Sequence, residues 1–385
     1  MSEWNSRSVR VVLLHNFLSP TRIPLFEALA ERFDLDVWIL GDIRSVRAWP
    51  ADAPGARARI RTLPHYTIPL GSRYNVVLIN YTLRRELARL KPDAIICCGW
   101  DTPAAFLAAR FARRTGTPFI VWSGSTPAET TFVRRVTKPW VRTLVCGAGA
   151  WVAYGSRAKE YLVSLGANTD KTFLAHNTVE LADFANACAA SDGVALRARL
   201  GIATKYVVLY CGNLLDLKGV GDLIEAFSKL GESDITLVLV GSGKHETKYR
   251  ARAKELGISG RVVFAGFAQP GDMSAYYALG DTLIVPSRKE VWGLVINEAL
   301  ACGVPVIATD ACGATPDLIR DGENGFVVPA RNPDALAGAI DAYFAHPERH
   351  RAMRDAARAS IAPFTIERAA DAFVDAVRCA MGNRA

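Results

Sequence analysis

The chain has 385 residues, and because a single hydrophobic core rarely grows beyond about 250–300 residues, this length predicts two domains. Half of the residues are hydrophobic and 22% are charged, a composition that excludes disordered and low-complexity proteins. The net charge of +8 is unevenly spread, since residues 1–175 hold 24 Lys and Arg against 13 Asp and Glu, while the remainder is slightly acidic.

Short apolar, β-branched runs alternate with longer amphipathic segments in the first half of the chain. The runs predict strands at 9–15, 35–40, 93–98, 118–122 and 150–154. The segments between them predict helices, for example at 24–33 and 103–115. Continuous apolar strands joined by crossover helices are typical of parallel sheets that are covered on both faces.

The second half repeats this alternation. Strands are predicted at 206–211, 236–240, 261–265, 282–285 and 304–309, and helices at 220–230, 245–256, 271–279, 294–302, 333–345 and 366–381. We therefore predict an α/β fold of two doubly wound, Rossmann-like parallel-sheet domains that face each other across a cleft. Polar and small residues interrupt the pattern within 177–201, which predicts domains at 1–176 and 177–362 and a C-terminal segment at 363–385.

Segment 286–303 carries the strongest functional pattern. A strand ends at Ser287, Glu290 lies in the loop that follows, and a helix begins at Gly293. The free N–H groups at the start of a helix form an anion site suited to a pyrophosphate. Glu298 lies about one turn into the helix, where its carboxylate can accept from ribose hydroxyls. This placement favours a nucleotide site over a pair of solvated helix carboxylates.

Segment 209–219 follows a similar plan. A strand gives way to a loop with Gly212, and Lys218 stands before the next helix. Its ammonium can meet the same pyrophosphate and neutralise a departing nucleoside diphosphate. The alternative is an exposed lysine at the end of a helix.

Together these segments resemble the family-4 retaining glycosyltransferases of GT-B fold, the glycosyl transferases group 1. The resemblance runs through nearly the whole chain. The segments that carry it are 212–219, 264–266, 290–307 and 321–325, with further likeness at 20–26, 154–156 and 176–178.

The resemblance implies a role for each matching residue. Lys218 would hold the donor phosphates and Glu290 the transferred sugar near its reacting carbon, and these two are the catalytic candidates. Glu298 would bind the ribose. The predicted donor-binding set also contains Gly212, Asn213, Phe264, Gly266, Phe267, Trp292, Gly293, Leu294 and Val295, of which Phe264, Gly266 and Phe267 would hold the base. The last helix would return onto the N-terminal, acceptor-binding domain.

The chain departs from the family pattern at two places. Asn213 stands where the family often has an arginine, so Lys218 would act with less help. On the acceptor side the paired glycines after the first strand are missing, and a Ser-Gly-Ser run replaces a histidine found in many members. The acceptor-side candidates are His15, Arg22, Ser123 and Ser125. For His15 and Arg22, local hydrogen bonding or solvation is an equal alternative.

The cysteine pattern predicts buried, reduced thiols, because none of the eight cysteines forms a CxxC pair. Asp34 and Asp36 form a DxD, a metal-binding pattern of another glycosyltransferase architecture, but they open a strand in the wrong domain. We therefore predict no metal and no cofactor, with the nucleotide sugar as a substrate. We also predict no nucleic-acid partner.

The balance of +11 in residues 1–175 predicts an anionic partner, either a membrane surface or a phosphorylated acceptor, unless the whole chain is simply Arg-rich. The best candidates for a lipid contact are Phe132, Arg134, Arg135, Lys138, Trp140 and Arg142. The N-terminal residues contain no apolar signal-peptide core. We therefore expect a cytoplasmic bacterial enzyme of cell-surface polysaccharide synthesis, at most peripheral at the inner face of the membrane.

The resulting hypothesis is transfer of a sugar from a UDP- or GDP-linked donor to a lipid-linked, polysaccharide or small-molecule acceptor. Two alternatives remain: a nucleotide-sugar-binding protein without transfer activity, and a sugar-nucleotide epimerase. A dehydrogenase is disfavoured, because the strands are not followed by GxGxxG with an acid about 20 residues on.

Overall fold

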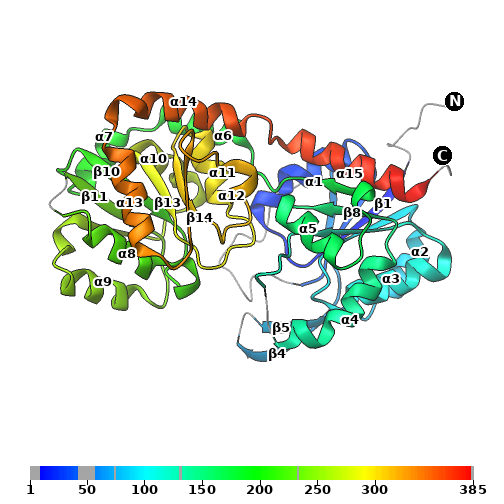
Figure 1. Ribbon diagram of the computed structural model, residues 1–385. Helices are drawn as coiled ribbons and strands as arrows, with labels where there is room; N and C mark the ends of the chain where they lie inside the picture. Colours follow the sequence, from blue (N-terminus) through cyan, green and yellow to red (C-terminus); the bar gives the residue numbers. More distant parts are fainter. Residues whose placement is uncertain (1–8, 42–56, 73–74, 130–131, 232–233, 383–385) are drawn as a thin grey trace. The chain divides into compact units, whose positions relative to one another are not determined.

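The computed structural model describes residues 9–41, 57–72, 75–129, 132–231 and 234–382 (Figure 1). The chain divides into two compact units. Unit 1 consists of Met1–Val179 and Thr365–Ala385, and unit 2 of Glu180–Phe364. Each unit is built on a parallel sheet with helices packed against it.

The sheet of unit 1 has seven parallel strands in the order β3-β2-β1-β6-β7-β8-β9. The strands are β1 (Arg10–His15), β2 (Asp34–Ile39), β3 (Arg59–Thr62), β6 (Ala94–Cys98), β7 (Phe119–Ser123), β8 (Ala150–Ala153) and β9 (Thr172–Leu174). The chain enters at the centre, builds toward one edge, and then returns to build toward the other. The order therefore reverses between β1 and β6, the point at which doubly wound sheets bind ligands.

Alternate residues of β1 enter two different cores. Val12 and Leu14 pack in a core with helices on one face of the sheet, whereas Val11 and Leu13 pack on the other face. Burial on both faces explains why β1 reads as one continuous apolar run. The helices of unit 1 are α1 (Ile23–Ala30), α2 (Leu83–Leu90), α3 (Pro103–Thr115), α4 (Phe132–Cys146), α5 (Ser156–Ser164) and α15 (Ile366–Met381).

Helix α15 closes one face of unit 1, although it comes last in the sequence. Phe373 is fully buried there and meets the Trp122 ring of β7 edge-on, with ring centroids 5.0 Å apart. Figure 1 shows this helix in red beside α1. Its N-cap is Thr365, whose hydroxyl accepts from the Arg368 N–H at 3.3 Å.

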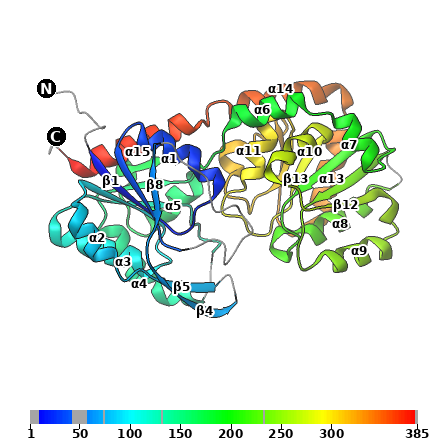
Figure 2. The same ribbon diagram turned by 180° about the vertical axis from the view of Figure 1, so that it is seen from behind.

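An antiparallel hairpin of β4 (Tyr66–Ser72) and β5 (Asn75–Ile79) was not anticipated (Figure 2). Pro69 and Gly71 lie in its sequence and argue against a strand. They are tolerated because the hairpin forms a separate two-stranded sheet, in which Pro69 pairs only with Val76. The side chains of Tyr66, Ile68, Ile79 and Tyr81 are exposed.

The sheet of unit 2 has six parallel strands in the order β12-β11-β10-β13-β14-β15. They are β10 (Tyr206–Cys211), β11 (Ile235–Val240), β12 (Val262–Gly266), β13 (Thr282–Val285), β14 (Val306–Thr309) and β15 (Gly325–Val328). This is the same doubly wound order as in unit 1, with the reversal between β10 and β13. The predicted pair of Rossmann-like parallel-sheet domains is confirmed.

The helices of unit 2 are α6 (Leu181–Ala190), α7 (Gly193–Arg199), α8 (Val220–Ser228), α9 (Glu246–Glu255), α10 (Met273–Leu279), α11 (Leu294–Ala301), α12 (Thr315–Leu318), α13 (Pro333–Phe344) and α14 (His350–Ile361). Helices α8, α9 and α13 share a core with one face of the sheet. Helices α10 and α11 contact β10, β13 and β14.

Several predicted bounds were wrong for identifiable reasons. Strand β14 begins at Val306 and not at 304, because Pro305 has no N–H to give to the ladder. The polar interruption around Asp192 lies between two helices, α6 and α7, that were not predicted. Asp192 caps α7, since its carboxylate accepts from the N–H groups of Val194 and Ala195 at 3.0 and 2.9 Å. Within the described part of the chain, helices are too short or too polar to cross a membrane.

Candidate active site

Two loops meet where the strand order of unit 2 reverses. One follows β10 and ends in a 3₁₀ turn at Asp216–Lys218; the other follows β13. The Leu217 carbonyl accepts from the Arg288 N–H at 2.9 Å. Gly219 has a φ of +69°, and a Cβ there would lie 1.8 Å from the Pro286 oxygen. Only glycine permits this close approach, so the sequence motif fixes the contact between the loops.

Lys218 and Glu290 form an ion pair at this junction, although they are 72 positions apart in the sequence. The Lys218 ammonium donates to the Glu290 carboxylate. The two side chains are only 28% and 18% exposed, so the pair is partly shielded from water. The two catalytic candidates thus come together at the carboxyl ends of adjacent strands.

The backbone around Glu290 is held by the loop after β14. The Glu290 N–H donates to Ala311 at 3.3 Å, and the Glu290 carbonyl accepts from Gly313 at 3.1 Å. A Cβ on Gly313 would lie 1.8 Å from the Val291 oxygen. These contacts fix the backbone of the loop, so only the Glu290 side chain can change its position when a ligand binds.

Gly293 supplies the turn from this loop into α11. Its φ of +102° lies in the left-handed region, and it is the N-cap of the helix. The N–H groups of Leu294 and Val295 stand in the first turn, where a helix offers no carbonyl partner. The junction therefore combines an ammonium with the positive end of a helix dipole.

Glu298 lies one turn further along α11, half-buried. Its carboxylate accepts from the Tyr277 hydroxyl of α10 at 2.6 Å. Burial raises the pKa of Glu298, and the hydrogen bond from Tyr277 partly opposes that shift. Tyr277 was missed by the sequence reasoning, because its place in a short helix carries no signal that it faces α11.

Trp292 is directed into the protein. Its indole N–H donates to the Asn297 side chain at 3.0 Å, and the residue is only 3% exposed. Arg288 is also bonded within the protein, since its guanidinium donates to both oxygens of Asp222 at 2.7 and 2.5 Å. These contacts brace the loop between β13 and α11 and were not predicted.

The remaining donor-side candidates lie at the ends of β10 and β12. Gly212 follows β10, and the carbonyl of exposed Asn213 accepts from the Tyr210 hydroxyl at 2.8 Å. At the end of β12, the Phe264 ring lies 4.2 Å from the Arg250 guanidinium carbon, and Gly266 has a φ of +74°. Phe267 projects with 64% of its surface exposed, an uncommon position for an apolar ring.

The acceptor-side candidates cluster in unit 1 around the end of β1. His15 is buried, its Nδ1 hydrogen-bonds the Phe17 carbonyl at 2.8 Å, and its ring packs against Phe26 and Trp122. Burial and then the nearby Arg22 charge lower the pKa of His15 to about 3. Its Nε2 is buried without a hydrogen-bond partner among the described residues.

The other three acceptor-side candidates bond within unit 1. The half-buried Arg22 donates to Asn177 at 2.6 Å and lies over the Trp122 ring. Ser123 accepts from the Ser125 N–H at 3.1 Å, and Ser125 accepts from Arg134 at 3.3 Å.

The two carboxylates of the DxD pattern are both paired. Asp34 accepts from Arg10 at 2.9 Å and from Arg59, and Asp36 accepts from Arg59 at 2.9 Å. These ion pairs give both carboxylates a structural role at the start of β2.

Known proteins resemble the chain over this region and beyond it. The family described as Glycosyl transferases group 1 matches residues 195–360. Over 306 residues the chain is 30% identical to alpha-D-kanosaminyltransferase of Streptomyces kanamyceticus, covering 75% of this chain and 77% of that protein. The chain belongs to the glycosyl transferases group 1 family. The family resemblance found in the sequence is thereby confirmed.

Other members of glycosyl transferases group 1 match over shorter stretches. D-inositol 3-phosphate glycosyltransferase of Acidothermus cellulolyticus is 34% identical over 197 residues, 48% of this chain and 43% of that protein. N-acetyl-alpha-D-glucosaminyl L-malate synthase of Bacillus anthracis is 32% identical over 172 residues, 44% of each. The chain spans somewhat less than half the length of these two curated relatives.

Solved structures agree on the fold. The Anabaena protein HepE, crystallised with UDP, has a TM-score of 0.74 at 19% identity, covering 95% of this chain and 98% of that one. Sucrose-phosphate synthase of Thermosynechococcus elongatus has a TM-score of 0.75 at 20% identity, with the same coverage. The predicted GT-B fold class is confirmed.

Proposed function

We propose that this member of glycosyl transferases group 1 is a retaining glycosyltransferase that uses a UDP- or GDP-linked sugar. The observation that carries the proposal is the pairing of Lys218 with Glu290 at the strand reversal of unit 2, beside the N-terminus of α11. A diphosphate and a sugar need a cation, free backbone N–H groups and a carboxylate within one small region. This junction supplies all three.

In the proposed donor site, different residues bind different parts of the nucleotide sugar. Lys218 and the first-turn amides of α11 would hold the diphosphate, Glu298 the ribose, and Glu290 the sugar. The exposed Phe267 ring offers a stacking surface for the base. Gly212 and Asn213 would line the phosphate side. Trp292 would act through the position of its loop, because its side chain is buried.

The proposed mechanism is electrostatic. Retention requires that the acceptor hydroxyl attack the face from which the diphosphate leaves. Stabilising the leaving diphosphate is then the main task, and fixed donors perform it at little reorganisation cost. Lys218 and the helix dipole would supply that positive potential, so we propose that donor binding needs no divalent metal.

The acceptor is proposed to bind in unit 1 near His15, Arg22, Ser123 and Ser125. Curated relatives are named for acceptors as different as D-inositol 3-phosphate and L-malate. Both names describe small molecules, and we propose a small-molecule, lipid-linked or polysaccharide acceptor for this chain. We propose a cytoplasmic bacterial enzyme of cell-surface polysaccharide synthesis that works at the inner face of the membrane.

The test is incubation with a panel of labelled nucleotide sugars and acceptors, followed by product analysis. Transfer with the donor's anomeric configuration kept, observed by NMR, is the expected result. Release of an epimerised nucleotide sugar would replace the proposal with an epimerase. If the protein binds the donor but leaves it unchanged with every acceptor, the alternative of a nucleotide-sugar-binding protein without transfer activity replaces the proposal.

A further inference from the structure

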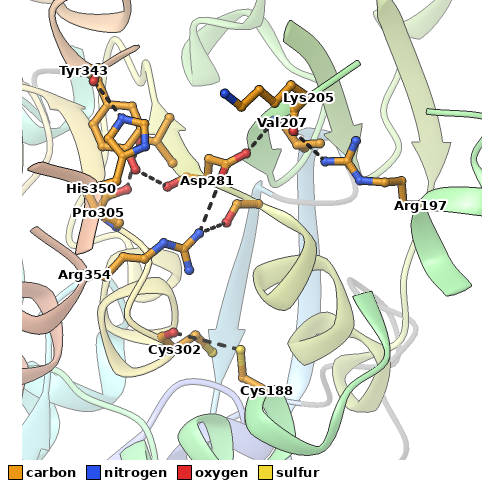
Figure 3. Close-up of polar contacts among 12 residues, drawn as sticks. Cys188, Arg197, Lys205, Val207, Asp281, Cys302, Pro305, Tyr343, His350 and Arg354 are labelled. Atoms are coloured by element: carbon orange, nitrogen blue, oxygen red, sulfur yellow. Dashed lines mark hydrogen bonds and ion pairs between the residues drawn. The ribbon is translucent and has the colours of Figure 1, made fainter. Parts of the chain in front are cut away.

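A pocket lies at the opposite end of α11 from Gly293. It measures about 500 Å³ and lies within unit 2 among helices α6, α7, α10, α11 and α14. Two thiols and three arginines line it: Cys188, Cys302, Arg197, Arg354 and Arg358. In Figure 3 the Cys188 sulfur points to the Cys302 carbonyl, Arg354 lies next to Cys302, and Arg197 lies farther off beside Lys205.

The two cysteines are neighbours where α6 packs against the end of α11. Cys188 on α6 is partly exposed, and its Sγ lies 4.0 Å from the Cys302 carbonyl oxygen at the C-terminal end of α11. Cys302 is buried, and its Sγ donates to the Phe184 carbonyl one turn back along α6 at 3.5 Å. One thiol is therefore accessible from the pocket, and a second lies directly behind it.

The charged groups around the pair favour a thiolate. Arg354 and Arg358 reach in from α14, and α10 contributes apolar Ala278 and Leu279. Arg197 of α7 lines the pocket, but its guanidinium donates to the Thr204 and Lys205 carbonyls. The guanidiniums donate mainly to backbone carbonyls, as Arg354 does to Gly280 at 2.8 Å (Figure 3).

Two carboxylates pair with these arginines, and a third, Glu298, lies one turn before Cys302 on α11. Asp281 lies 3.7 Å from Arg354, and Asp355 lies 3.4 Å from Arg358. Interaction with the Cys302 side chain is the main cause that lowers the pKa of Cys188 to about 7, and Arg354 and Arg358 lower it further against the effect of burial. By contrast, burial raises the pKa of Cys98 and of Cys312 to about 11.

We propose that Cys188 and Cys302 form an oxidation site, in which a peroxide converts the pair to a disulfide. The Cys188 thiolate attacks one peroxide oxygen, the O–O bond breaks, and a sulfenic acid and hydroxide form. Cys302 then attacks the Cys188 sulfur as it loses its proton, the S–O bond breaks, and water leaves. In total two thiols lose two electrons to one peroxide, which becomes two waters.

The site is placed to affect the proposed donor site, and this part rests on the proposed function. Cys302 lies one turn beyond Glu298, and its N–H donates to the Glu298 carbonyl at 3.1 Å. The Phe184 ring of α6 meets the ring of Tyr277, which bonds Glu298. A disulfide needs the sulfurs about 2.0 Å apart, so closing it pulls α6 against the end of α11. We expect weaker nucleotide binding after oxidation.

The test treats the full chain with hydrogen peroxide, alkylates the remaining thiols, and maps peptides by mass spectrometry without reduction. The expected product joins Cys188 to Cys302. In Cys302→Ser, whose hydroxyl keeps a hydrogen-bond donor, Cys188 should accumulate as a sulfenic acid that dimedone traps. Cys146→Ser, which removes an exposed thiol elsewhere, should leave the cross-link unchanged. The idea is overturned if Cys188 stays reduced while Cys146 is oxidised.

Two further readouts separate the parts of the proposal. Arg358→Gln should slow the oxidation of Cys188 near pH 7 and move the midpoint of its pH profile upward; an unchanged profile would remove the arginine from the site. UDP and GDP titrations before and after oxidation test the coupling. A cross-link that leaves nucleotide affinity unchanged refutes the coupling alone. A chain that binds neither nucleotide in either state refutes the proposed donor instead.

Discussion

Lys218 donates to Glu290 in the structure, so a nucleoside diphosphate entering the proposed site competes with a carboxylate for the same ammonium. Lys218 should therefore support both nucleotide binding and turnover, whereas Glu290 should oppose nucleotide binding and support turnover. Glu298, bonded to Tyr277, is separate from this competition. The three side chains should be distinguishable by their kinetics.

Glu290→Gln should bind UDP or GDP more tightly, because Lys218 loses its competing carboxylate. The gain should be about fivefold, since partly exposed ion pairs contribute on the order of 1 kcal/mol. Turnover with the nucleotide sugar should nevertheless fall by a large factor, whereas Glu298→Gln should mainly raise the donor KM. Calorimetry and initial rates measure both quantities, and Glu255→Gln, at an exposed position of α9, is the control. A fully active Glu290→Gln would remove that residue from the site.

His15 predicts a pH dependence of the stability of unit 1. Its pKa is about 3 in the folded chain and near 6.5 when unfolded, so the unfolded state binds the extra proton between these values. Above pH 6.5 neutral His15 does not disfavour folding. As pH falls below 6.5, protonation of His15 in the unfolded chain lowers the free energy of unfolding. Seven of the eight tryptophans lie in unit 1, so their fluorescence follows its unfolding. Between pH 7 and 4 the melting temperature should fall less in His15→Gln than in the wild type or His65→Gln; parallel slopes would contradict this.

At the scale of elements, the site depends on how closely two loops approach. Gly219 combines a left-handed backbone with contact to Pro286, and Gly257 has nearly the same φ of +71° with open space where a Cβ would be. The two glycines thus differ in packing but not in backbone conformation.

Gly257→Ala should cost only the backbone strain, about 1–2 kcal/mol. Gly219→Ala should cost more, because the methyl group displaces the β13 loop, and it should also weaken nucleotide binding. Thermal unfolding and calorimetry of both variants decide this. Equal losses in the two variants would mean that the approach of the loops is unimportant.

Much of this arrangement could be predicted from the sequence. Strands buried on both faces read as continuous apolar runs, so β10 and β13 were predicted with the bounds that the structure has. The amphipathic pattern likewise predicted the bounds of helices α3 and α15. Lys218, Glu290, Gly293 and Glu298 stand out because each lies just after a strand or at the start of a helix.

Partners from distant segments could not be predicted. The bond from Tyr277 to Glu298 and the turn of Trp292 toward Asn297 depend on side-chain directions that no periodicity encodes. The hairpin was missed because Pro69 and Gly71 mask its strands. The sequence predicted that Lys218 and the Glu290 segment share one diphosphate site, but it did not predict the direct ion pair between the two side chains.

For the whole molecule, charge differs between the two halves of the chain. Helix α4 exposes Arg135, Lys138, Trp140 and Arg142, as a lipid contact requires. Arg134 is instead paired with Asp101 and Glu129, which weakens its candidacy. The Phe132 side chain lies outside the described residues.

Replacing Arg135, Lys138 and Arg142 with Gln should reduce binding to anionic liposomes at low salt, since each basic residue near such a surface contributes about 1 kcal/mol. Exposed Lys254, Arg349 and Arg351 of unit 2 provide a charge-matched control triple. Co-sedimentation with anionic and neutral vesicles measures the effect. Equally weak binding of the wild type to both vesicles would favour a soluble acceptor.

The central claim is that Lys218, at the strand reversal of unit 2, holds the diphosphate of a nucleotide donor without a metal. Calorimetric titration of UDP, GDP and ADP in EDTA tests it most directly, with Lys218→Ala beside Lys229→Ala, a lysine paired with Asp334 elsewhere on the unit. We predict that at least one nucleotide binds and that Lys218→Ala weakens it by roughly 10- to 100-fold, while Lys229→Ala binds as the wild type does. Unchanged affinity in Lys218→Ala, or binding that appears only when a divalent metal is restored, would contradict the claim.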